Sequence, residues 1–581
     1  MECKRIKLSV DIVVPLRVHN PPVVPVSFSP PRAVPKRVEA YTREDEPEID
    51  TERLVQCGVV STPLPFQRTC IHFLNTHKNV ALLDAMGLGK TFQVLCAIRS
   101  DPPSSRFLSD AVAAGRYRGN TLIVCPKIVQ AQWLEQHAKH LKSTHKALAY
   151  TSKTASSSLI DLCSHEIVVT TYDFLRSVTT KNASLVSIQW WRVVLDEAHC
   201  VKNHASKRFE YIDLLECTRR VALSGTPMHN TLTDLFPMLR FFRSFKGSLD
   251  ASFEEWRQNV VLPLETNKKN EATEYVQKII EPFVIRRLKS STWKGVPLLS
   301  NMPRKRYATI DVRMSPEETK TYAGIEKGCV KRGILIDAST IGKQESAYDG
   351  FKKLHKLRLC CVASTLKSSR EDHSCVSCEG KQATMRASCE CLVCDSCVPV
   401  SNRCLACDAP STSTRALEQV QTEPRCYDRS SKLQALETYV QTTPRNDKII
   451  VFSSWVMVLD AIQTSCSLGD CARIDGSMSQ TERMAQLARF RSTHRVLLMT
   501  FGAGSTGIDL TCANHVVFVD PHWSPAIEMQ AEDRAYRIGQ TKEVHIVHLI
   551  QSRSDGSGTI EQVIRGVQRR KRKAMNDIFP I

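Results

Sequence analysis

Short runs of mostly apolar residues are the feature that most restricts the fold of this 581-residue chain. They recur between amphipathic stretches in two regions, one from about residue 62 and one from about residue 431. Strands that are apolar throughout are typical of parallel sheets covered by helices on both faces. The runs are Val80–Leu83, Leu122–Val124, Ile167–Val169, Val193–Leu195, Val221–Leu223, Ile449–Phe452, Val496–Met499, Val516–Val519 and Ile546–Ile550. The sequence therefore predicts an α/β fold with two parallel-sheet lobes.

The segments outside these lobes differ in composition. The N-terminal segment is rich in proline and has no helical period, which is typical of an extended arm. The region between the lobes contains a cluster of cysteines and a polar linker. The predicted division is 1–61 arm, 62–300 first lobe, 301–370 helical region, 371–410 cysteine-rich module, 411–430 linker and 431–581 second lobe with a basic tail.

The chain carries a net charge of +19, and more than half of this excess lies in residues 61–300. This excess of positive charge indicates a polyanionic partner, and nucleic acid is the first candidate. The basic run Arg569–Lys573 indicates a nuclear localisation signal or a nucleic-acid contact, or else a solvated face of the last helix. No apolar run approaches the length of a membrane span, and the N-terminus is too charged for a secretory signal. With the basic run read as a localisation signal, we expect a nuclear protein.

The run Asp84-Ala85-Met86-Gly87-Leu88-Gly89-Lys90-Thr91 follows an expected strand and precedes an expected helix. That context is the one a phosphate loop requires. Glycines let backbone N–H groups approach phosphate, and the helix N-terminus adds partial positive charge. We expect Lys90 to reach the β- and γ-phosphates of ATP and Thr91 to bind Mg²⁺.

Two further motifs fit the same reaction. Asp196 and Glu197 end another expected strand, where an acid lies beside the phosphate loop in such sheets. We expect Asp196 to hold Mg²⁺ and Glu197 to orient or deprotonate the attacking water. In the second lobe Arg534 and Arg537 share one helix face, from which an arginine can stabilise charge on the γ-phosphate if the lobes close on ATP.

The cysteine cluster has the spacing of a zinc module. Its three Cys-x2-Cys pairs and one Cys-x-Cys pair supply eight thiolates, enough for two tetrahedral Zn²⁺ sites. Disulfides are the less favoured alternative in a chain without an export signal. The eight residues are Cys375, Cys378, Cys389, Cys391, Cys394, Cys397, Cys404 and Cys407.

Taken in order, the motifs resemble those of the Swi/Snf-type DNA translocases, a branch of the superfamily-two helicase-like ATPases. The match spans about 62–300 and 430–575. It rests on Leu64-Pro65-Phe66-Gln67, Asp84–Thr91, Leu122-Ile123-Val124-Cys125-Pro126, Asp196–His199, Ser224-Gly225-Thr226-Pro227, Asp520-Pro521-His522-Trp523-Ser524-Pro525 and Arg537-Ile538-Gly539-Gln540. The resemblance implies two RecA-like lobes with helical insertions, and movement along duplex DNA without strand separation.

The resemblance also implies roles for the matching residues. Lys90, Asp196, Glu197, Arg534 and Arg537 would be catalytic. ATP and Mg²⁺ would be bound by Gln67, which would read the adenine, and by Asp84, Met86, Gly87, Leu88, Gly89, Lys90, Thr91, Asp196, Gly507 and Asp509. Coupling between ATP state and DNA grip would involve Ser224, Gly225, Thr226 and Gln530, and DNA contacts would come from Lys127, Thr170, Thr171, Ser453 and Trp523.

The cysteine module resembles a RING finger with Cys391 where His is usual. Cross-brace pairing would place Cys375, Cys378, Cys394 and Cys397 on one ion and Cys389, Cys391, Cys404 and Cys407 on the other. A RING finger placed between the two ATPase lobes is similar to the arrangement in the RING-containing DNA-repair branch of this family. Active ligases usually carry proline and a basic residue where this chain has Leu405 and Asp408. The module could therefore bind a ubiquitin-conjugating enzyme, or it could be a structural zinc knot or a protein-docking module.

These observations predict a DNA-dependent ATPase that translocates on double-stranded DNA, either free or nucleosomal, in chromatin remodelling, DNA repair or transcription. Its cofactors would be ATP, Mg²⁺ and two Zn²⁺. Two alternatives stay open. One is a RING-type ubiquitin ligase that the ATPase lobes target to DNA. The other is a transcription-linked ATPase of a large DNA virus, which would act at a viral replication site.

Overall fold

The structure of the chain is a computed structural model, and it describes the residues from 41 to 579. Gaps lie at 109–116, 143–145, 152–153, 155–157, 176–182, 202, 229–231, 267, 300–301, 331–346, 363–384, 388–391, 394–413, 417–429 and 505–507. No helix in the described ranges combines the length and apolar character needed to cross a membrane.

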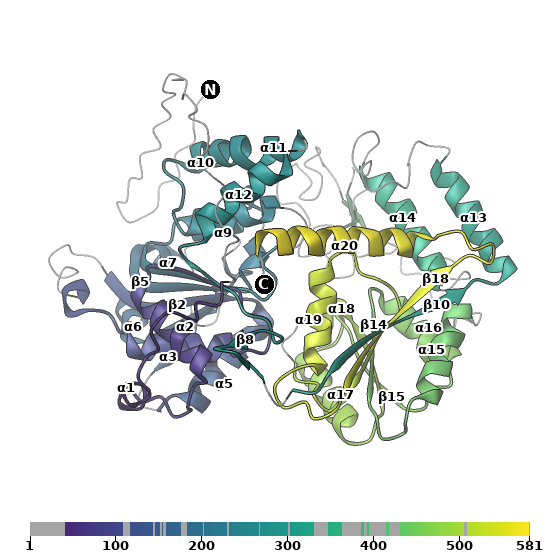
Figure 1. Cartoon of the computed structure of the whole chain (residues 1–581), viewed down its shortest axis with the longest axis horizontal. Coiled ribbons are helices and arrows are strands. Elements are labelled where there is room, and N and C mark those ends of the chain that lie inside the picture. The colour runs from purple at the N-terminus through teal and green to yellow at the C-terminus, as the bar shows by residue number, and fades with distance from the viewer. Residues whose placement is uncertain are drawn as a thin grey trace. The chain divides into compact units, whose positions relative to one another are not determined.

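The first lobe is built on a seven-stranded sheet whose strand pairings are all parallel, in the order β3-β4-β2-β5-β6-β1-β7 (Figure 1). The strands are β1 Asn79–Leu82, β2 Tyr117–Cys125, β3 Ala147–Ala149, β4 Ile167–Thr171, β5 Ile188–Asp196, β6 Cys217–Leu223 and β7 Val284–Ile285. The helices are α1 Thr51–Gln56, α2 Pro65–Thr76, α3 Lys90–Ser100, α5 Gln130–His140, α6 Leu159–Ser164, α7 Ala183–Ser187, α8 Lys207–Asp213, α9 Phe236–Phe241, α10 Leu249–Trp256, α11 Leu262–Glu265 and α12 Lys269–Ile280. A two-stranded hairpin, β8 Thr292–Trp293 and β9 Val296–Pro297, follows.

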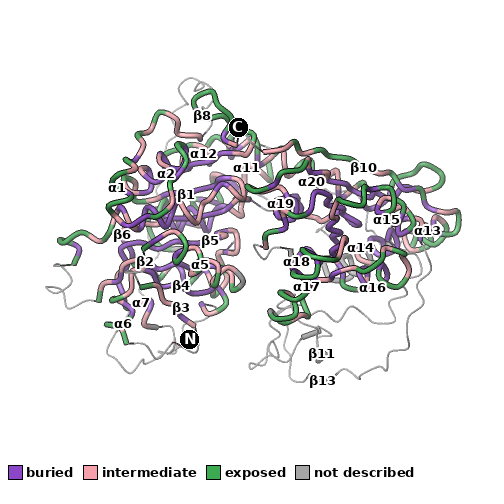
Figure 2. Tube along the Cα trace, turned by 90° about the horizontal axis from the view of Figure 1, so that it is seen from below, coloured by how far each residue is buried: buried purple, intermediate pink, exposed green. Residues whose placement is uncertain are grey.

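Alternate residues of these strands enter one hydrophobic core with α2, α3 and α5. Val80 and Leu82 of β1 and Ile123 of β2 are fully buried in it. Figure 2 shows that buried residues, drawn in purple, are concentrated along the strands. Since neighbouring strand residues point to opposite faces and both are buried, the sheet is covered on both sides, as the apolar runs predict.

The second lobe contains a six-stranded sheet with parallel pairings in the order β10-β18-β17-β14-β16-β15. Alternate residues of β14 supply two cores: Ile449 and Val451 pack with α15 and α16, and Ile450 and Phe452 pack with α17 and α19. The strands are β10 Lys305–Arg313, β14 Ile449–Ser453, β15 Cys471–Ile474, β16 Val496–Thr500, β17 His515–Phe518 and β18 Val544–Ser552. The helices are α13 Pro316–Val330, α14 Ala347–Val362, α15 Ser431–Thr442, α16 Val456–Ser465, α17 Gln480–Ser492, α18 Phe501–Gly504, α19 Pro525–Ala535 and α20 Ile560–Ile578.

The region 301–370, expected to be helical, begins with a strand of the second lobe. β10 pairs with β18 over its whole length, from Lys305 opposite Val544 to Arg313 opposite Ser552. It forms the outer edge of the sheet, and residues 306–309 are exposed. An edge strand with a solvated surface needs no apolar run, which is why the sequence pattern does not reveal it.

The first lobe also begins earlier than the predicted boundary at residue 62. Tyr41, Ile49 and Leu54 are buried, and Glu48 forms an ion pair with Arg68 of α2 at 2.6 Å. The segment from residue 41 is therefore part of the lobe.

A long segment is inserted into the second lobe between α14 and α15. Its two ends meet, because the hydroxyl of Ser430, which caps α15, donates a 2.6 Å hydrogen bond to the carbonyl of Val362. Within it the structure describes three short antiparallel strands, β11 Met385–Ala387, β12 Leu392–Val393 and β13 Thr414–Ala416. The eight candidate zinc-binding cysteines lie outside the described residues.

Candidate functional site

The loop between β1 and α3 has the backbone of a phosphate-binding loop. Gly87 and Gly89 have φ values of 85° and 81°, in the region that favours glycine. A Cβ atom at Gly89 would lie 2.6 Å from the Nε2 atom of Gln67. The Lys90 ammonium donates to the carbonyls of Asp84 at 2.7 Å and Ala85 at 3.3 Å. Charged phosphate oxygens are stronger acceptors than these carbonyls, so bound phosphate can draw Lys90 away from them.

Gln67 lies directly against this loop. Its Nε2 atom donates to the Leu88 carbonyl at 3.1 Å, and its Oε1 atom accepts from the Leu64 N–H at 2.9 Å. The side chain is only 5% exposed. These contacts fix the amide at the start of α2, beside the loop where ATP is expected.

The Asp84 carboxylate faces away from the loop surface and is completely buried. Arg287, just after β7, donates to its Oδ1 from Nε at 2.9 Å and to its Oδ2 from Nη2 at 2.5 Å. The same guanidinium bonds to the Phe66 carbonyl and to Gln93 of α3. Asp84 thus ties the loop to α2, α3 and β7. We expect it to support the loop rather than touch the nucleotide, unlike its assignment among the ATP-binding residues.

The acid pair lies at the carboxyl end of β5. Asp196 accepts hydrogen bonds from Trp133 Nε1 at 2.8 Å and from the Glu197 N–H at 2.9 Å, and Glu197 has a left-handed backbone with φ 49°. Burial and the neighbouring Glu197 raise the pKa of Asp196. Burial alone would also raise the pKa of Glu197, but the adjacent His199, Lys90 and Arg534 outweigh it and hold that pKa low. The two carboxyl groups therefore titrate as a coupled pair, in which Asp196 releases its proton at a higher pH than Glu197.

A chain of polar contacts leads from Glu197 to the second lobe. Glu197 Oε2 lies 3.3 Å from His199 Nδ1, which lies 3.2 Å from Ser224 Oγ. Ser224 Oγ accepts from the Thr226 N–H at 3.1 Å, and Gln530 Nε2 of α19 donates to Thr226 Oγ1 at 3.4 Å. The predicted coupling residues thus join the two lobes.

Gly225 lies in the same turn as Ser224 and Thr226. A Cβ atom there would lie 2.7 Å from the Met86 side chain and 3.6 Å from Lys90 Nζ. Glycine therefore lets this turn approach the phosphate loop.

Of the two predicted arginine fingers, Arg534 lies in the last turn of α19, whereas Arg537 follows the helix, which ends at Ala535. The two therefore do not share one helix face as predicted, because the backbone leaves the helix at Tyr536. Burial lowers the pKa of Arg534 to about 10 despite its attraction to Glu197. Arg537 Cγ lies 3.7 Å from the position that a Cβ atom on Gly87 would occupy. Both arginines of the second lobe therefore lie beside groups of the ATP site in the first.

Lys289, which sequence analysis did not single out, crosses between the lobes at the same place. Its ammonium lies 2.7 Å from Asp533 Oδ1 and donates to the Tyr536 carbonyl. It also lies 3.7 Å from the Cβ position on Gly87. The side chains of Lys289 and Asp533 are 9% and 13% exposed, so solvent screens this ion pair weakly.

The predicted DNA contacts divide into two groups. Lys127, in the 3-10 turn Lys127–Val129, is exposed, and Trp523 is partly exposed. Thr170 and Ser453 are fully buried, and their hydroxyls donate to the Tyr150 carbonyl at 3.1 Å and to Asp520 at 2.6 Å. The hydroxyl of Thr171 accepts from the Phe174 N–H at 3.3 Å. Thr170 and Ser453 thus hold strand ends in place, and Thr171 is buried as well; their role as DNA contacts stays a prediction.

Other predicted residues have simpler surroundings. Leu88 is buried under the phosphate loop, and Thr91 in the first turn of α3 is partly exposed. Asp509 is exposed and accepts from the Thr511 N–H at 3.0 Å. Gly507 lies outside the described residues. Across the described ranges no group of three or more His, Cys, Asp or Glu side chains could hold a metal ion.

A phosphate loop, an acid pair and two facing arginines on paired parallel sheets define the class of helicase-like ATPases. The model of the SNF2-related domain matches residues 66–366, and that of the helicase conserved C-terminal domain matches residues 431–539. The first match covers more than half of the chain, which therefore belongs to the SNF2-related family.

Several curated proteins are similar to the chain. The DNA repair protein RAD5A of Arabidopsis thaliana is 28% identical over 87% of this chain and 59% of its own length. The helicase-like transcription factor of Mus musculus is 28% identical over 76% of this chain and 50% of its own. The chain spans about half the length of the curated relatives it matches.

Among solved structures, the Sulfolobus solfataricus SWI2/SNF2 ATPase core in complex with dsDNA is similar. It has 22% sequence identity and a TM-score of 0.37, and the match covers 90% of this chain and 98% of that one.

Proposed function

We propose that the protein hydrolyses Mg·ATP and uses the cycle to move along double-stranded DNA. The observation that carries this proposal is the meeting of two sets of groups. Lys90 and the acid pair come from the first lobe, and Arg534 and Arg537 come from the second. An ATPase with this division hydrolyses ATP only when its lobes come together, so the reaction and the lobe movement are linked.

Each residue has a distinct task in this proposal. Lys90 and the loop N–H groups hold the β- and γ-phosphates at the N-terminus of α3. Glu197, whose low pKa keeps it ionised, orients the attacking water and accepts its proton. Arg537 approaches the transferred phosphoryl group from the second lobe and stabilises its developing charge, with Arg534 behind it against Glu197.

The acid pair also suits Mg²⁺. Carboxylate oxygens are its preferred protein ligands. Asp196 is buried and Glu197 is half-buried, both near the charge of Lys90, and Glu197 Oε2 accepts no well-aligned hydrogen bond within the described part of the chain. Asp196 would hold the ion, with Thr91 at the start of α3. When bound, Mg²⁺ neutralises phosphate charge.

The coupling of hydrolysis to movement would use the polar chain from Glu197 through His199, Ser224 and Thr226 to Gln530. Loss of the γ-phosphate changes the charge beside Glu197, where this polar chain begins, and Gln530, where it ends, belongs to the second lobe. The net charge of +19, concentrated in the first lobe, suits a grip on the DNA backbone that weakens with salt. Lys127 and Trp523 are the accessible predicted contacts.

The test is the ATP hydrolysis rate of the purified chain with duplex DNA, with RNA and without nucleic acid. We expect stimulation by duplex DNA that declines as salt rises. A triplex-displacement assay then measures movement. Stimulation by RNA alone would replace the proposal with an RNA-dependent ATPase.

We further propose that the inserted segment carries two Zn²⁺ ions on its eight clustered cysteines. Support comes from their paired spacing, typical of structural zinc sites. Metal analysis of the purified protein should give about two zinc per chain. A content near zero would remove the zinc module from the proposal.

Ubiquitin ligation at this module is the second activity to test. An autoubiquitination assay with a panel of conjugating enzymes separates a ligase from a structural or docking module. The names of the relatives support a role in DNA repair or transcription, and therefore in the nucleus. The predicted domain division is carried into this proposal, with the first lobe starting at residue 41 and β10 assigned to the second lobe.

A further inference from the structure

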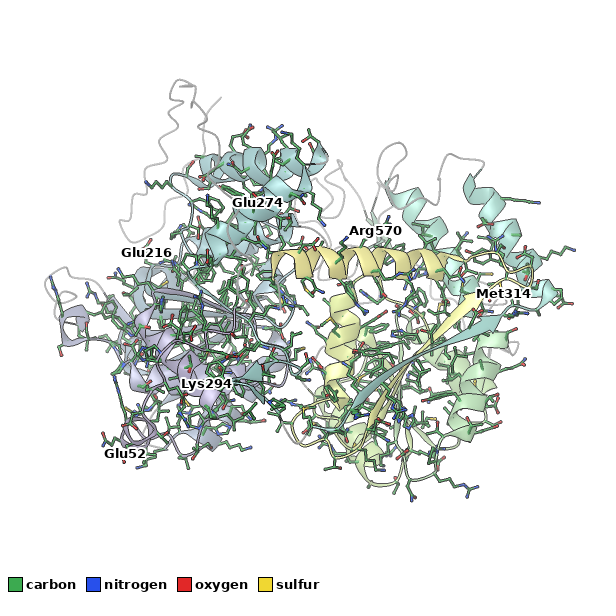
Figure 3. The ribbon with its side chains drawn as sticks, viewed as in Figure 1. Glu52, Glu216, Glu274, Lys294, Met314 and Arg570 are labelled. Atoms are coloured by element: carbon green, nitrogen blue, oxygen red, sulfur yellow. The ribbon has the colours of Figure 1, made fainter. Side chains whose placement is uncertain are left out.

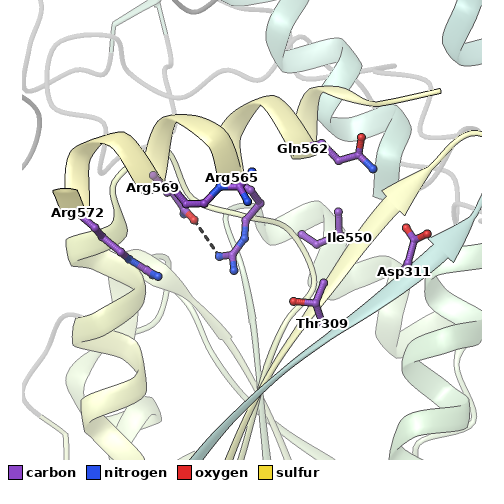
Figure 4. Close-up of a pocket in the computed structure, with 8 residues that line it drawn as sticks. Thr309, Asp311, Ile550, Gln562, Arg565, Arg569 and Arg572 are labelled. Carbon is purple, nitrogen blue, oxygen red and sulfur yellow. Dashed lines mark hydrogen bonds between the residues drawn. The ribbon is translucent and has the colours of Figure 1, made fainter. Parts of the chain in front are cut away.

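A pocket of about 340 Å³ lies within the second lobe, between α20 and the edge of the sheet (Figure 4). One wall is formed by Thr309 and Asp311 of β10 and Ile550 of β18, and the other by α20. Its helix wall consists of Gln562, Arg565, Gln568, Arg569 and Arg572. The pocket is separate from the residues of the ATP site.

Three arginines converge on this pocket because their spacing places them on one face of α20. Arg565 and Arg572 are 24% and 36% exposed, so their charges remain accessible. Arg569 forms no hydrogen bond or ion pair with any residue that the structure describes, and the Nε of Arg572 is buried without a partner there. The arginines therefore retain unused hydrogen-bond donors.

The negative charge near these arginines is smaller than the positive charge. Arg565 lies 3.4 Å and Arg572 3.9 Å from Glu528 Oε2 beneath the pocket, and Asp311 lies on the opposite wall. Burial raises the pKa of Glu528 to about 7, so this carboxyl is only partly ionised near neutral pH. Burial is the main cause of the lowered pKa of Arg565; Glu528 and Glu532 act to raise it, and Arg572 and Arg569 act to lower it. Glu532 is itself paired with Lys305 at 2.6 Å. An incoming anion would relieve the repulsion among the three arginines.

We propose that this pocket binds a compact small molecule carrying two or more phosphate groups. Guanidinium groups present paired N–H donors that match phosphate oxygens, and three of them in one hollow can share several phosphates. Thr309 and Gln562 supply further polar contacts, and Ile550 gives an apolar wall. A concave site bounded by a strand and a helix suits a compact ligand, whereas a DNA backbone requires an extended track.

The proposal can be tested with inositol hexakisphosphate as the probe. Binding is measured by calorimetry on the full chain at fixed salt, with the ATP site filled by a non-hydrolysable ATP analogue. Arg569→Gln removes one pocket cation without breaking a contact to the described residues. Arg570→Gln is the matched control, because Arg570 is exposed on the same helix (Figure 3) and does not line the pocket.

We expect Arg569→Gln to weaken probe binding by about tenfold, the effect of losing one charge-assisted contact. Arg570→Gln should change it by less than about twofold, because salt screens a charge outside the pocket. Equal loss in both variants would mean a diffuse basic helix and would overturn the proposal, as would no binding by the unaltered chain.

A second pair of variants fills the pocket without changing charge. Thr309 and Ala308 are both exposed on β10, but only Thr309 lines the pocket. Thr309→Trp should abolish probe binding, and Ala308→Trp should leave it unchanged; similar binding in both refutes the pocket. Finally, if Arg569→Gln weakens duplex DNA binding more than probe binding, the arginines serve the DNA backbone and the proposal fails.

Discussion

Replacing Lys289 by methionine should slow ATP hydrolysis without greatly changing the affinity for ATP. The Lys289 ammonium is held by Asp533 at 2.7 Å and by the Tyr536 carbonyl, beside Gly87 of the phosphate loop. Asp533 directly precedes Arg534 in α19, and the Tyr536 carbonyl that Lys289 also contacts directly precedes Arg537. This ion pair therefore holds Arg534 and Arg537 next to the ATP site.

The expected loss follows from the burial of the pair. A charge-assisted hydrogen bond contributes about 1.5–3 kcal/mol net. Side chains that are 9% and 13% exposed retain most of this because water screens them little. If the bond stabilises only the assembled site, its removal lowers kcat by about 10- to 100-fold. The KM for ATP should change little, because Lys90 and the loop are intact.

The assay is steady-state hydrolysis with saturating duplex DNA, together with a charge exchange. Lys289→Asp combined with Asp533→Lys restores an ion pair and should recover much of the lost kcat. Lys294→Met is the control, since Lys294 is 59% exposed and pairs with Glu48 on the surface. A rate for Lys289→Met equal to that of the control, or exchange variants whose defects simply add, would refute the reasoning.

Four other changes have defined outcomes. Lys90→Ala should reduce hydrolysis to background while circular dichroism stays unchanged; measurable turnover would contradict the assigned phosphate site. Arg537→Ala should lower kcat by about 10³-fold with a smaller effect on ATP affinity, as measured by nucleotide titration. Arg287→Met leaves the buried Asp84 unpaired and should cost about 3–5 kcal/mol in denaturant unfolding. Burial raises the folded pKa of Glu528 from 4.5 to about 7, so the folded state binds the extra proton and stability falls as pH rises from about 4.5 to 7; Glu528→Gln should remove a pH dependence on the order of 3 kcal/mol from melting curves in that range.

The apolar runs predicted most of the two sheets because their strands are buried on both faces. A parallel sheet covered by helices on both faces is the simplest fold that buries runs such as Val80–Leu83 and Val496–Met499. β10 could not be found in this way, because its position at the edge leaves residues 306–309 in solvent. Its strand character depends on pairing with β18, more than two hundred residues further along the chain.

The candidate site shows the same division between local and distant signals. The phosphate loop and the acid pair are local patterns, and the structure places them at strand ends as expected. Arg287 and Lys289 have no local pattern, since their partners Asp84 and Asp533 are distant in sequence. Thr170 and Ser453 were expected at the DNA surface, but spacing alone does not reveal that their hydroxyls point into the protein.

The hydrogen bond between Ser430 and Val362 has a consequence for the evolution and engineering of the chain. A segment whose ends already touch can be added or removed at small entropic cost, because the surrounding fold does not depend on its length. Replacing residues 363–429 by a short glycine-serine bridge should therefore leave the sheet, α14 and α15 intact. The two lobes would then fold without the cysteine-rich segment, and that segment can be exchanged or lost independently of them.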